Sequence, residues 1–402
     1  MTVKNMMRNS DANEPGYASG KPLLMLMTPM LHQGGFERVA VQTARLMEPY
    51  FRVFILIFSD RDIAYDISGL EIVNISMDVK KGKLRKLLNM FRRARAVRKV
   101  RKERRPDYVY SFGPSANLVN VFSKVKDGGK TVLGLRNYTD VEETHKMRLF
   151  VKRADLIISC SVPIDRAVRE VYGSRDTAVQ YNMVDVEKIR REALEGDAEL
   201  PFGEDRRILI SVGREADQKG FWYMIKAFSL IHRELPDTAL VIVGAGKFTD
   251  YRKLADDLGI SDSVYFSGVT KTPYRYMKRG SLYLLTSLTE GFPNALVEAM
   301  ALGLPCVCSN CMTGPAEILS DAGDYGKNEV IYGKYGILTP PLTEGKDLDP
   351  SVMTDSERLY AKTVTDLLSD DKMMEEYGQK ARKRSEDFST RAYAESLFKI
   401  LK

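Results

Sequence analysis

The sequence predicts an α/β protein built from two doubly wound parallel-sheet domains in series. The first indication is length, because 402 residues exceed the size at which one hydrophobic core keeps growing. The second is that short apolar runs alternate with amphipathic stretches, and that this alternation restarts after a polar stretch near residue 195. Strands that alternate with helices form parallel sheets with helices on both faces.

The first half opens with an apolar run at Leu23–Leu31, a glycine turn at Gly34-Gly35 and a helical pattern up to Met47. Later strands of this half are expected at 51–58, 108–110, 132–134 and 156–158, and those of the second half at 208–212, 239–243, 264–266, 281–286, 305–309 and 336–338. We therefore expect a disordered lead-in at 1–20, domains at 21–190 and 200–385, and a C-terminal helix at 386–402 that crosses back to the first domain.

Composition points to the reducing cytoplasm. Residues 1–20 lack the apolar core of a signal peptide, and the apolar runs are too short to cross a bilayer. Four cysteines make no disulfide framework, and Cys306, Cys308 and Cys311 lie too far in sequence from any histidine to indicate zinc. They are interpreted as core residues, and no metal site is expected.

The positive charge is concentrated in one segment. The net charge is +7, with 32 basic and 20 acidic residues up to Asp185 against 29 and 34 after it. Residues 80–105 alone hold 14 Lys or Arg and the single acid Glu103. Apolar residues form a helical stripe there that is expected to pack on the sheet: Leu84, Leu87, Leu88, Phe91, Ala94, Val97 and Val100. The cations predict peripheral binding to the anionic inner face of the plasma membrane, since no nucleic-acid motif accompanies them.

The segment from Glu290 to Pro305 is the most informative one for chemistry. Pro293 is placed to start a helix, with Glu290 in the loop before it and Glu298 on its second turn. The first amides of this helix, those of Asn294, Ala295 and Leu296, would favour an anion such as a diphosphate. The two carboxylates would then accept hydrogen bonds from sugar hydroxyls.

A second segment supplies cations. Arg214 and Lys219 follow a predicted strand that ends at Gly213, and ligands of open α/β sheets bind at the carboxyl ends of strands. Two positive charges there would stabilise the negative charge on a departing nucleoside diphosphate.

These segments resemble glycosyltransferase family 4, the retaining GT-B transferases, over nearly the whole chain. The resemblance is to members that build bacterial capsule, exopolysaccharide or lipopolysaccharide. The ordered set of motifs is Gly34–Arg38, Asn182–Ile189, Gly213-Arg214 with Lys219-Gly220, Val243–Gly246, Gly268, Glu290–Glu298 and Thr313–Glu317. The resemblance implies a GT-B fold, with two Rossmann-like domains facing a cleft and the donor held by the C-terminal domain.

The resemblance also implies the roles of individual residues. Glu298 would hold the ribose hydroxyls, Glu290 the donor hexose, and Arg214 and Lys219 the diphosphate. Further donor contacts would come from Gly34, Gly35, Gly268, Phe292, Asn294, Ala295 and Leu296. Where many relatives carry a histidine this chain has Arg136-Asn137, which we expect to contact donor or acceptor.

The expected activity is transfer of a hexose-type sugar, with a UDP-sugar as the expected donor, to a membrane-associated glycan or lipid-linked acceptor in polysaccharide synthesis. No cofactor or metal is expected, because Asp347-Leu348-Asp349 matches a metal-binding string but follows no strand. Alternatives are a soluble transferase acting on a small sugar or a protein, and a non-transferring relative such as an epimerase or a pure binding protein. An NAD-linked enzyme is disfavoured because no Gly-x-Gly-x-x-Gly loop is followed by the required acid.

Overall fold

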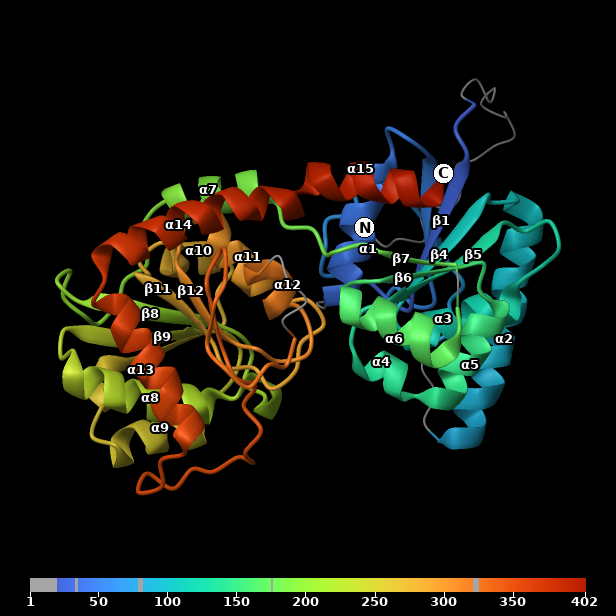
Figure 1. Cartoon of the computed structure of the whole chain (residues 1–402). Helices are drawn as coiled ribbons and strands as arrows, with labels where there is room; N and C mark the ends of the chain where they lie inside the picture. Colours follow the sequence, from blue (N-terminus) through green and yellow to red (C-terminus); the bar gives the residue numbers. More distant parts are fainter. Residues whose placement is uncertain (1–19, 33–34, 79–81, 175, 321–324) are drawn as a thin grey trace.

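Two seven-stranded sheets form the two halves of the molecule, each with helices on both faces (Figure 1). The computed structural model describes residues 20–402 except 33–34, 79–81, 175 and 321–324. The predicted lead-in and Gly34 therefore lie outside the described residues, apart from Gly20. The two doubly wound parallel-sheet domains predicted from the sequence are confirmed.

The N-terminal sheet has the strand order β3-β2-β1-β4-β5-β6-β7, with all neighbours parallel. Its strands are β1 (Leu23–Thr28), β2 (Arg52–Ile57), β3 (Glu71–Asn74), β4 (Tyr108–Phe112), β5 (Lys130–Leu135), β6 (Leu156–Ser159) and β7 (Thr177–Val179). The helices that follow or connect them are α1 (Gly35–Met47), α2 (Lys83–Arg104), α3 (Pro114–Ser123), α4 (Thr139–Glu142), α5 (Thr144–Arg153) and α6 (Val162–Tyr172).

The C-terminal sheet has the order β10-β9-β8-β11-β12-β14-β13, and only β13 runs antiparallel to its neighbour. Its strands are β8 (Arg207–Val212), β9 (Thr238–Val243), β10 (Val264–Gly268), β11 (Leu282–Leu285), β12 (Cys306–Ser309), β13 (Ile331–Tyr332) and β14 (Ile337–Thr339). The helices are α8 (Phe221–Glu234), α9 (Thr249–Asp257), α10 (Pro273–Met277), α11 (Asn294–Ala301), α12 (Pro315–Leu319), α13 (Asp355–Leu368) and α14 (Asp371–Ser385).

The chain order of the strands reverses between β1 and β4 in one sheet and between β8 and β11 in the other. Such switch points leave a crevice at the carboxyl ends of the strands, where ligands of this class of sheet bind.

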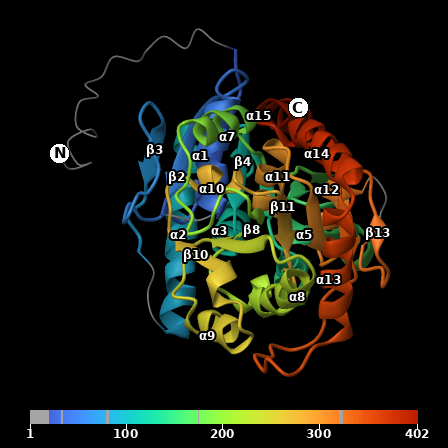
Figure 2. The same ribbon diagram turned by 90° about the vertical axis from the view of Figure 1, so that its left-hand side faces the viewer.

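The central strands β1, β4, β8, β9 and β11 are almost wholly buried and apolar, as parallel strands covered on both faces must be. The edge strands β3, β7 and β13 were not predicted, because each is short and at best half buried; in Figure 2, β3 lies at the outer edge of its sheet.

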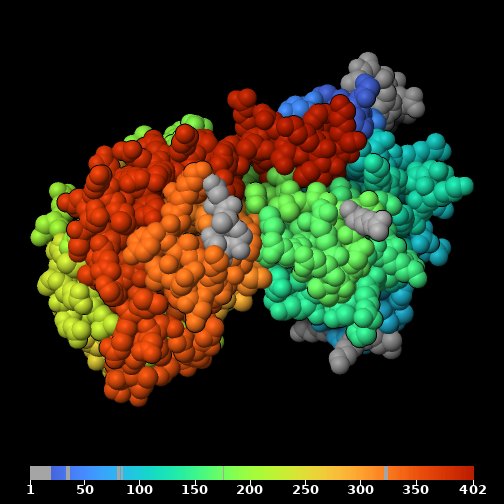
Figure 3. Space-filling view, in the orientation of Figure 1, coloured from blue at the N-terminus to red at the C-terminus, as the bar shows by residue number. Residues whose placement is uncertain are grey.

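Two helices connect the halves. α7 (Val186–Leu194) packs against α10 and α11 of the second half, and the predicted limit of the first domain at residue 190 falls within this helix. α15 (Thr390–Leu401) crosses back onto α1: Phe398 stacks on Tyr50 with ring centroids 4.6 Å apart, and the hydroxyls of Thr43 and Tyr393 lie 2.8 Å apart. Figure 3 shows the surface hollowed between the halves beneath this C-terminal segment.

The apolar stripe of α2 is only half buried, which corrects the expectation that it packs on the sheet. Ala94 and Val97 are buried, but Leu87, Leu88 and Phe91 expose 50%, 56% and 49% of their surface. Phe91 contacts the ring of Phe122 on α3, with centroids 5.5 Å apart, so this part of the stripe meets α3 while about half of its surface stays exposed. Within the described residues, no helix is long and apolar enough to span a membrane.

Two of the cations in this segment are structural. The guanidinium of Arg101 is fully buried and donates to the carbonyls of Gly128 and Gly129 and to the hydroxyl of Thr131. Arg93, also buried, donates to the carbonyl of Met77. Burial lowers the pKa of Arg101 to about 10. These two arginines therefore hold α2 on its sheet and do not belong to its outer charged surface.

Candidate active site

The carboxyl ends of both sheets border one cleft of about 320 Å³. Six of the residues singled out in the sequence line it: Arg136, Asn137, Arg214, Glu290, Phe292 and Asn294. Val39, Asn182, Gln218 and Gly291 complete the lining. Residues separated by more than 150 positions are thereby brought together at the two switch points.

An ion pair between Lys219 and Glu290 lies at the centre of the C-terminal side. Lys219 Nζ is 2.6 Å from Glu290 Oε1, and the hydroxyl of Ser287 donates to the same oxygen at 2.7 Å. The Lys219 side chain is 19% exposed and that of Glu290 is 9% exposed. Because both charges are largely removed from water, they interact more strongly with each other, and with a bound ligand, than surface charges would.

Glycines at positions 213 and 220 allow the side chain of Lys219 to reach Glu290. Lys219 ends a short 3-10 helix after β8, and its side chain passes over Gly213, where an added Cβ would lie 3.2 Å from Lys219 Cε. Gly220 follows with φ +59°, and a Cβ there would lie 2.3 Å from the carbonyl oxygen of Thr286. The hydroxyl of Thr286 donates to the carbonyls of Lys219 and Gly220, which ties this turn to the end of β11.

The N-terminus of α11 faces the cleft, although one of its three predicted amides is already engaged. The amide of Leu296 donates to the carbonyl of Pro293 at 3.0 Å, and the Leu296 side chain is fully buried. Among the described residues, the amides of Asn294 and Ala295 have no protein acceptor. The expected diphosphate contact of Leu296 is therefore wrong for its amide, since helix formation itself has used that donor.

Glu298 lies deeper and is contacted from both halves. Its carboxylate is 6% exposed, and Oε1 is 3.4 Å from Arg38 Nη1 and 3.5 Å from the hydroxyl of Tyr274. Burial and the neighbouring carboxylate raise the pKa of Tyr274, so its hydroxyl stays protonated as a donor. The pairing with Arg38 across 260 residues is a site contact that sequence reasoning missed, although Arg38 belongs to the Gly34–Arg38 motif and lies in the first turn of α1.

Arg136 is a buried cation beneath the N-terminal side of the cleft. It is 6% exposed, and it donates to Asn182 Oδ1 at 2.9 Å and to the hydroxyl of Tyr110 at 2.7 Å. Asn182 in turn donates to Asn294 Oδ1 at 3.2 Å, so a polar chain links Arg136 to the start of α11. No carboxylate of the described residues pairs with Arg136.

The remaining predicted residues are placed as follows. Arg214 is exposed at the rim of the cleft, and Gly268 ends β10 at the same edge of the sheet with φ +70°. Gly35 begins α1. Their expected contacts with a donor stay predictions.

The two halves also touch through the segment that follows β12. The hydroxyl of Ser161 donates to the hydroxyl of Thr313 at 3.0 Å, and the amide of Val162 donates to Glu317 Oε2 at 2.9 Å. Thr313 and Glu317 are 0% and 5% exposed. Burial raises the pKa of Glu317 to about 7, although the Val162 amide and Arg384 act to lower it.

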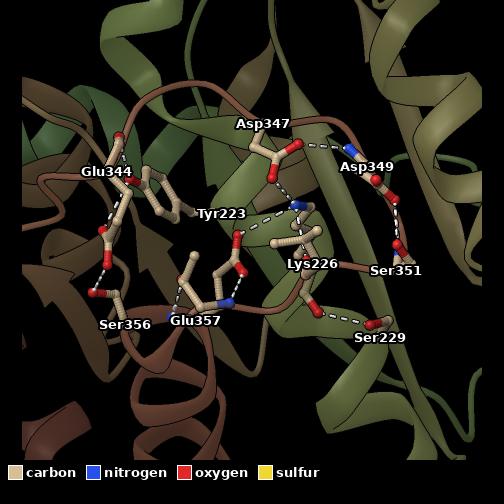
Figure 4. A network of polar contacts seen from close by, with 11 residues as sticks. Tyr223, Lys226, Ser229, Glu344, Asp347, Asp349, Ser351, Ser356 and Glu357 are labelled. Carbon is tan, nitrogen blue, oxygen red and sulfur yellow. Dashed lines mark hydrogen bonds and ion pairs between the residues drawn. The ribbon is translucent and has the colours of Figure 1, made fainter.

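The Asp347-Leu348-Asp349 string serves the fold of its loop (Figure 4). Asp347 Oδ2 is 3.8 Å from Nζ of the fully buried Lys226, which also donates to the carbonyl of Val352. Asp349 Oδ1 accepts from the amide and the hydroxyl of Ser351. In the described part of the chain no group of three His, Cys, Asp or Glu could hold a metal ion. All four cysteines are buried.

The model of the family "Glycosyl transferases group 1" matches residues 194–332, the part that carries Arg214, Lys219, Glu290 and Glu298. The chain is a glycosyltransferase, and it is similar to this family over that segment. An uncharacterized glycosyltransferase of Methanocaldococcus jannaschii is 29% identical over 332 residues, which cover 74% of this chain and 80% of that protein. This glycosyltransferase is thus related to it through both halves.

Other relatives are named for glycan synthesis. The N-acetylgalactosamine-N,N'-diacetylbacillosaminyl-diphospho-undecaprenol 4-alpha-N-acetylgalactosaminyltransferase of Campylobacter jejuni is 25% identical and covers 92% of this chain and 97% of its own. The lipopolysaccharide 1,6-galactosyltransferase of Salmonella typhimurium is 27% identical and covers 58% and 65%.

The fold is shared with HepE of Anabaena, solved with UDP and glucose. The TM-score is 0.69 at 19% identity, covering 94% of this chain and 98% of that one.

Glu317 generates a pH-dependent contribution to stability. Its pKa is about 7 in the folded protein and 4.5 for an ordinary glutamate, so the folded state holds the proton more tightly. Its contribution is present below pH 4.5 and is lost as pH rises through about 7. We expect the melting temperature of wild type to fall more between pH 5 and pH 8 than that of Glu317→Gln, as measured by calorimetry. Identical pH dependence in the two proteins would contradict this account.

Proposed function

We propose that this glycosyltransferase is a retaining enzyme that moves a hexose-type sugar from a nucleoside diphosphate sugar, with UDP as the nucleotide, to a glycan or lipid-linked acceptor in cell-surface polysaccharide synthesis. The Lys219–Glu290 pair beside the free amides of α11 is the observation that carries the proposal. Anions bind at helix N-termini, and a nearby lysine adds charge where the leaving group develops it. UDP is favoured because the fold is shared with a protein that binds it.

Each side of the cleft has a distinct task in this reaction. Glu298 accepts hydrogen bonds from the ribose hydroxyls, and Glu290 accepts them from the hexose. Lys219, Arg214 and the amides of Asn294 and Ala295 bind the diphosphate. Asn137 and the buried Arg136 face the acceptor side, where Arg136 adds positive potential because no carboxylate of the described residues neutralises it.

The chemical step is a front-face displacement. The bond between C1 of the sugar and the diphosphate oxygen breaks, and the acceptor hydroxyl attacks C1 from the same face. Its proton passes to the departing phosphate, so the step needs no protein base. Lys219 and Arg214 supply the positive charge that a divalent ion supplies in other transferases, and we propose that the enzyme works without a metal.

The exposed surface of α2, in the N-terminal half, supports an acceptor that is bound to a membrane. Leu88, Arg92, Arg95, Lys99 and Lys102 follow each other on α2 at intervals of three or four residues, and all are exposed. One face of the helix therefore presents an exposed leucine followed by four cations. Such a face suits an anionic membrane, where each cation adds about 1 kcal/mol. The Campylobacter relative, whose name gives a diphospho-undecaprenol acceptor, supports an acceptor of the same kind.

Replacing Lys219 tests the chemistry directly. We expect Lys219→Ala to lower kcat by about 10² to 10³, the usual loss when one preorganised donor to a leaving group is removed. Release of nucleoside diphosphate in a coupled assay measures it. Lys253→Ala is the matched control, since Lys253 lies on α9 in an exposed ion pair with Asp257, and it should keep wild-type turnover. Turnover of Lys219→Ala within twofold of wild type would remove Lys219 from the mechanism.

The membrane contact has its own test. Leu87→Ser/Leu88→Ser/Phe91→Ser should reduce co-sedimentation with vesicles containing anionic lipid by about tenfold, because it removes exposed apolar area next to the cations. Leu194→Ser is the matched control, since Leu194 is 76% exposed on α7. Equal sedimentation of wild type with neutral and anionic vesicles, or of the triple variant and wild type, would rule out this role of α2.

A further inference from the structure

The loop that carries Glu290 is enclosed by two other segments of the chain. On one side Gly291 packs against the N-terminal half, where a Cβ on Gly291 would lie 2.1 Å from the carbonyl oxygen of Arg136. On the other side the amide of Glu290 donates to the carbonyl of Met312, and the amide of Thr313 donates back to the carbonyl of Glu290 at 2.7 Å. The loop is therefore hydrogen-bonded to residues 312–313 of its own half and packed against residue 136 of the other half.

The hydroxyl of Thr313 joins this loop to the opposite half. It donates to the carbonyl of Gly291 at 2.7 Å and accepts from the hydroxyl of Ser161 at 3.0 Å. Ser161 and Thr313 are both fully buried, so no water replaces either partner. A buried hydroxyl that loses its partner is costly, which makes this contact sensitive to the distance between the halves.

Glu317 completes the contact through the end of a helix. Ser161 is the N-cap of α6, yet its side chain makes no capping hydrogen bond to the helix. The amide of Val162 is instead satisfied by Glu317 Oε2, from the other half. The N-terminus of α6 is thus capped across the interface, and separation of the halves would leave the amide of Val162 without this acceptor.

We propose that Ser161, Thr313 and Glu317 are positioning residues through which the N-terminal half aligns the Glu290 loop. The hydroxyl of Thr313 accepts from Ser161 of that half and donates to the carbonyl of Gly291, next to Glu290. The inference rests on the proposed role of Glu290 in binding the donor sugar. It adds that Ser161, in the N-terminal half, acts on Glu290 through Thr313 and not through the donor.

Kinetics of paired variants test it. Thr313→Val keeps the volume and removes the hydroxyl, while Ser161→Ala removes its partner from the opposite half. Each should lower kcat by about 10- to 100-fold, the scale of losses caused by small misplacements, while the Kd of the nucleoside diphosphate changes less than threefold. Because both variants remove the hydrogen bond between Ser161 and Thr313, the double variant should lose no more than the larger single loss. Thr313→Ser should restore kcat, and so should Glu317→Gln relative to Glu317→Ala.

A matched control separates positioning from stability. Thr339→Val removes another buried hydroxyl, one without a protein partner, from β14 of the same half, and it should leave kcat unchanged. Wild-type kcat in both Thr313→Val and Ser161→Ala, or losses that multiply in the double variant, would overturn the inference. If wild type itself neither binds a nucleoside diphosphate nor transfers a sugar, the proposed function fails instead.

Discussion

The structure depends on a geometric constraint: the carboxyl ends of two separate parallel sheets must open toward one cleft. Because the strands are parallel, the loops that follow them lie at the same edge of the sheet. Arg214 after β8 and Glu290 after β11 therefore line the same cleft. The second sheet can face that edge only if the chain also connects the two halves. α15 makes such a connection by returning to α1, and its Phe398 stacks on Tyr50, just after α1.

Charge inside the cleft follows from this arrangement. Lys219 is neutralised by Glu290, whereas Arg136 and Arg214 have no carboxylate partner among the described residues. The lining is therefore positive on balance, and the two free amides in the first turn of α11 add to this potential, which suits an anionic ligand. Burial makes these charges effective, since water is largely excluded from Lys219 and Glu290.

Local patterns predicted the fold and the C-terminal side of the site, because strands, glycine turns and helix starts are encoded over a few residues. Lys219 and Glu290 were found in this way, through the strand end at Gly213 and the helix start at Pro293. Contacts between distant segments were not predicted, because the pairs Arg38–Glu298 and Ser161–Thr313 have no local signal in the sequence. The interpretation of Leu87 failed similarly, since helical periodicity identifies an apolar face but not whether a layer covers it.

The central claim is that this cleft binds a nucleoside diphosphate and its sugar, and thermal-shift measurement of the purified protein tests it most directly. UDP, GDP, ADP and their hexose conjugates would be compared at equal concentration, since a ligand that binds only the folded state raises the melting temperature. The account predicts a clear rise with one nucleoside diphosphate, UDP, and a larger rise with its sugar. No rise with any nucleotide or nucleotide sugar at millimolar concentration would contradict it.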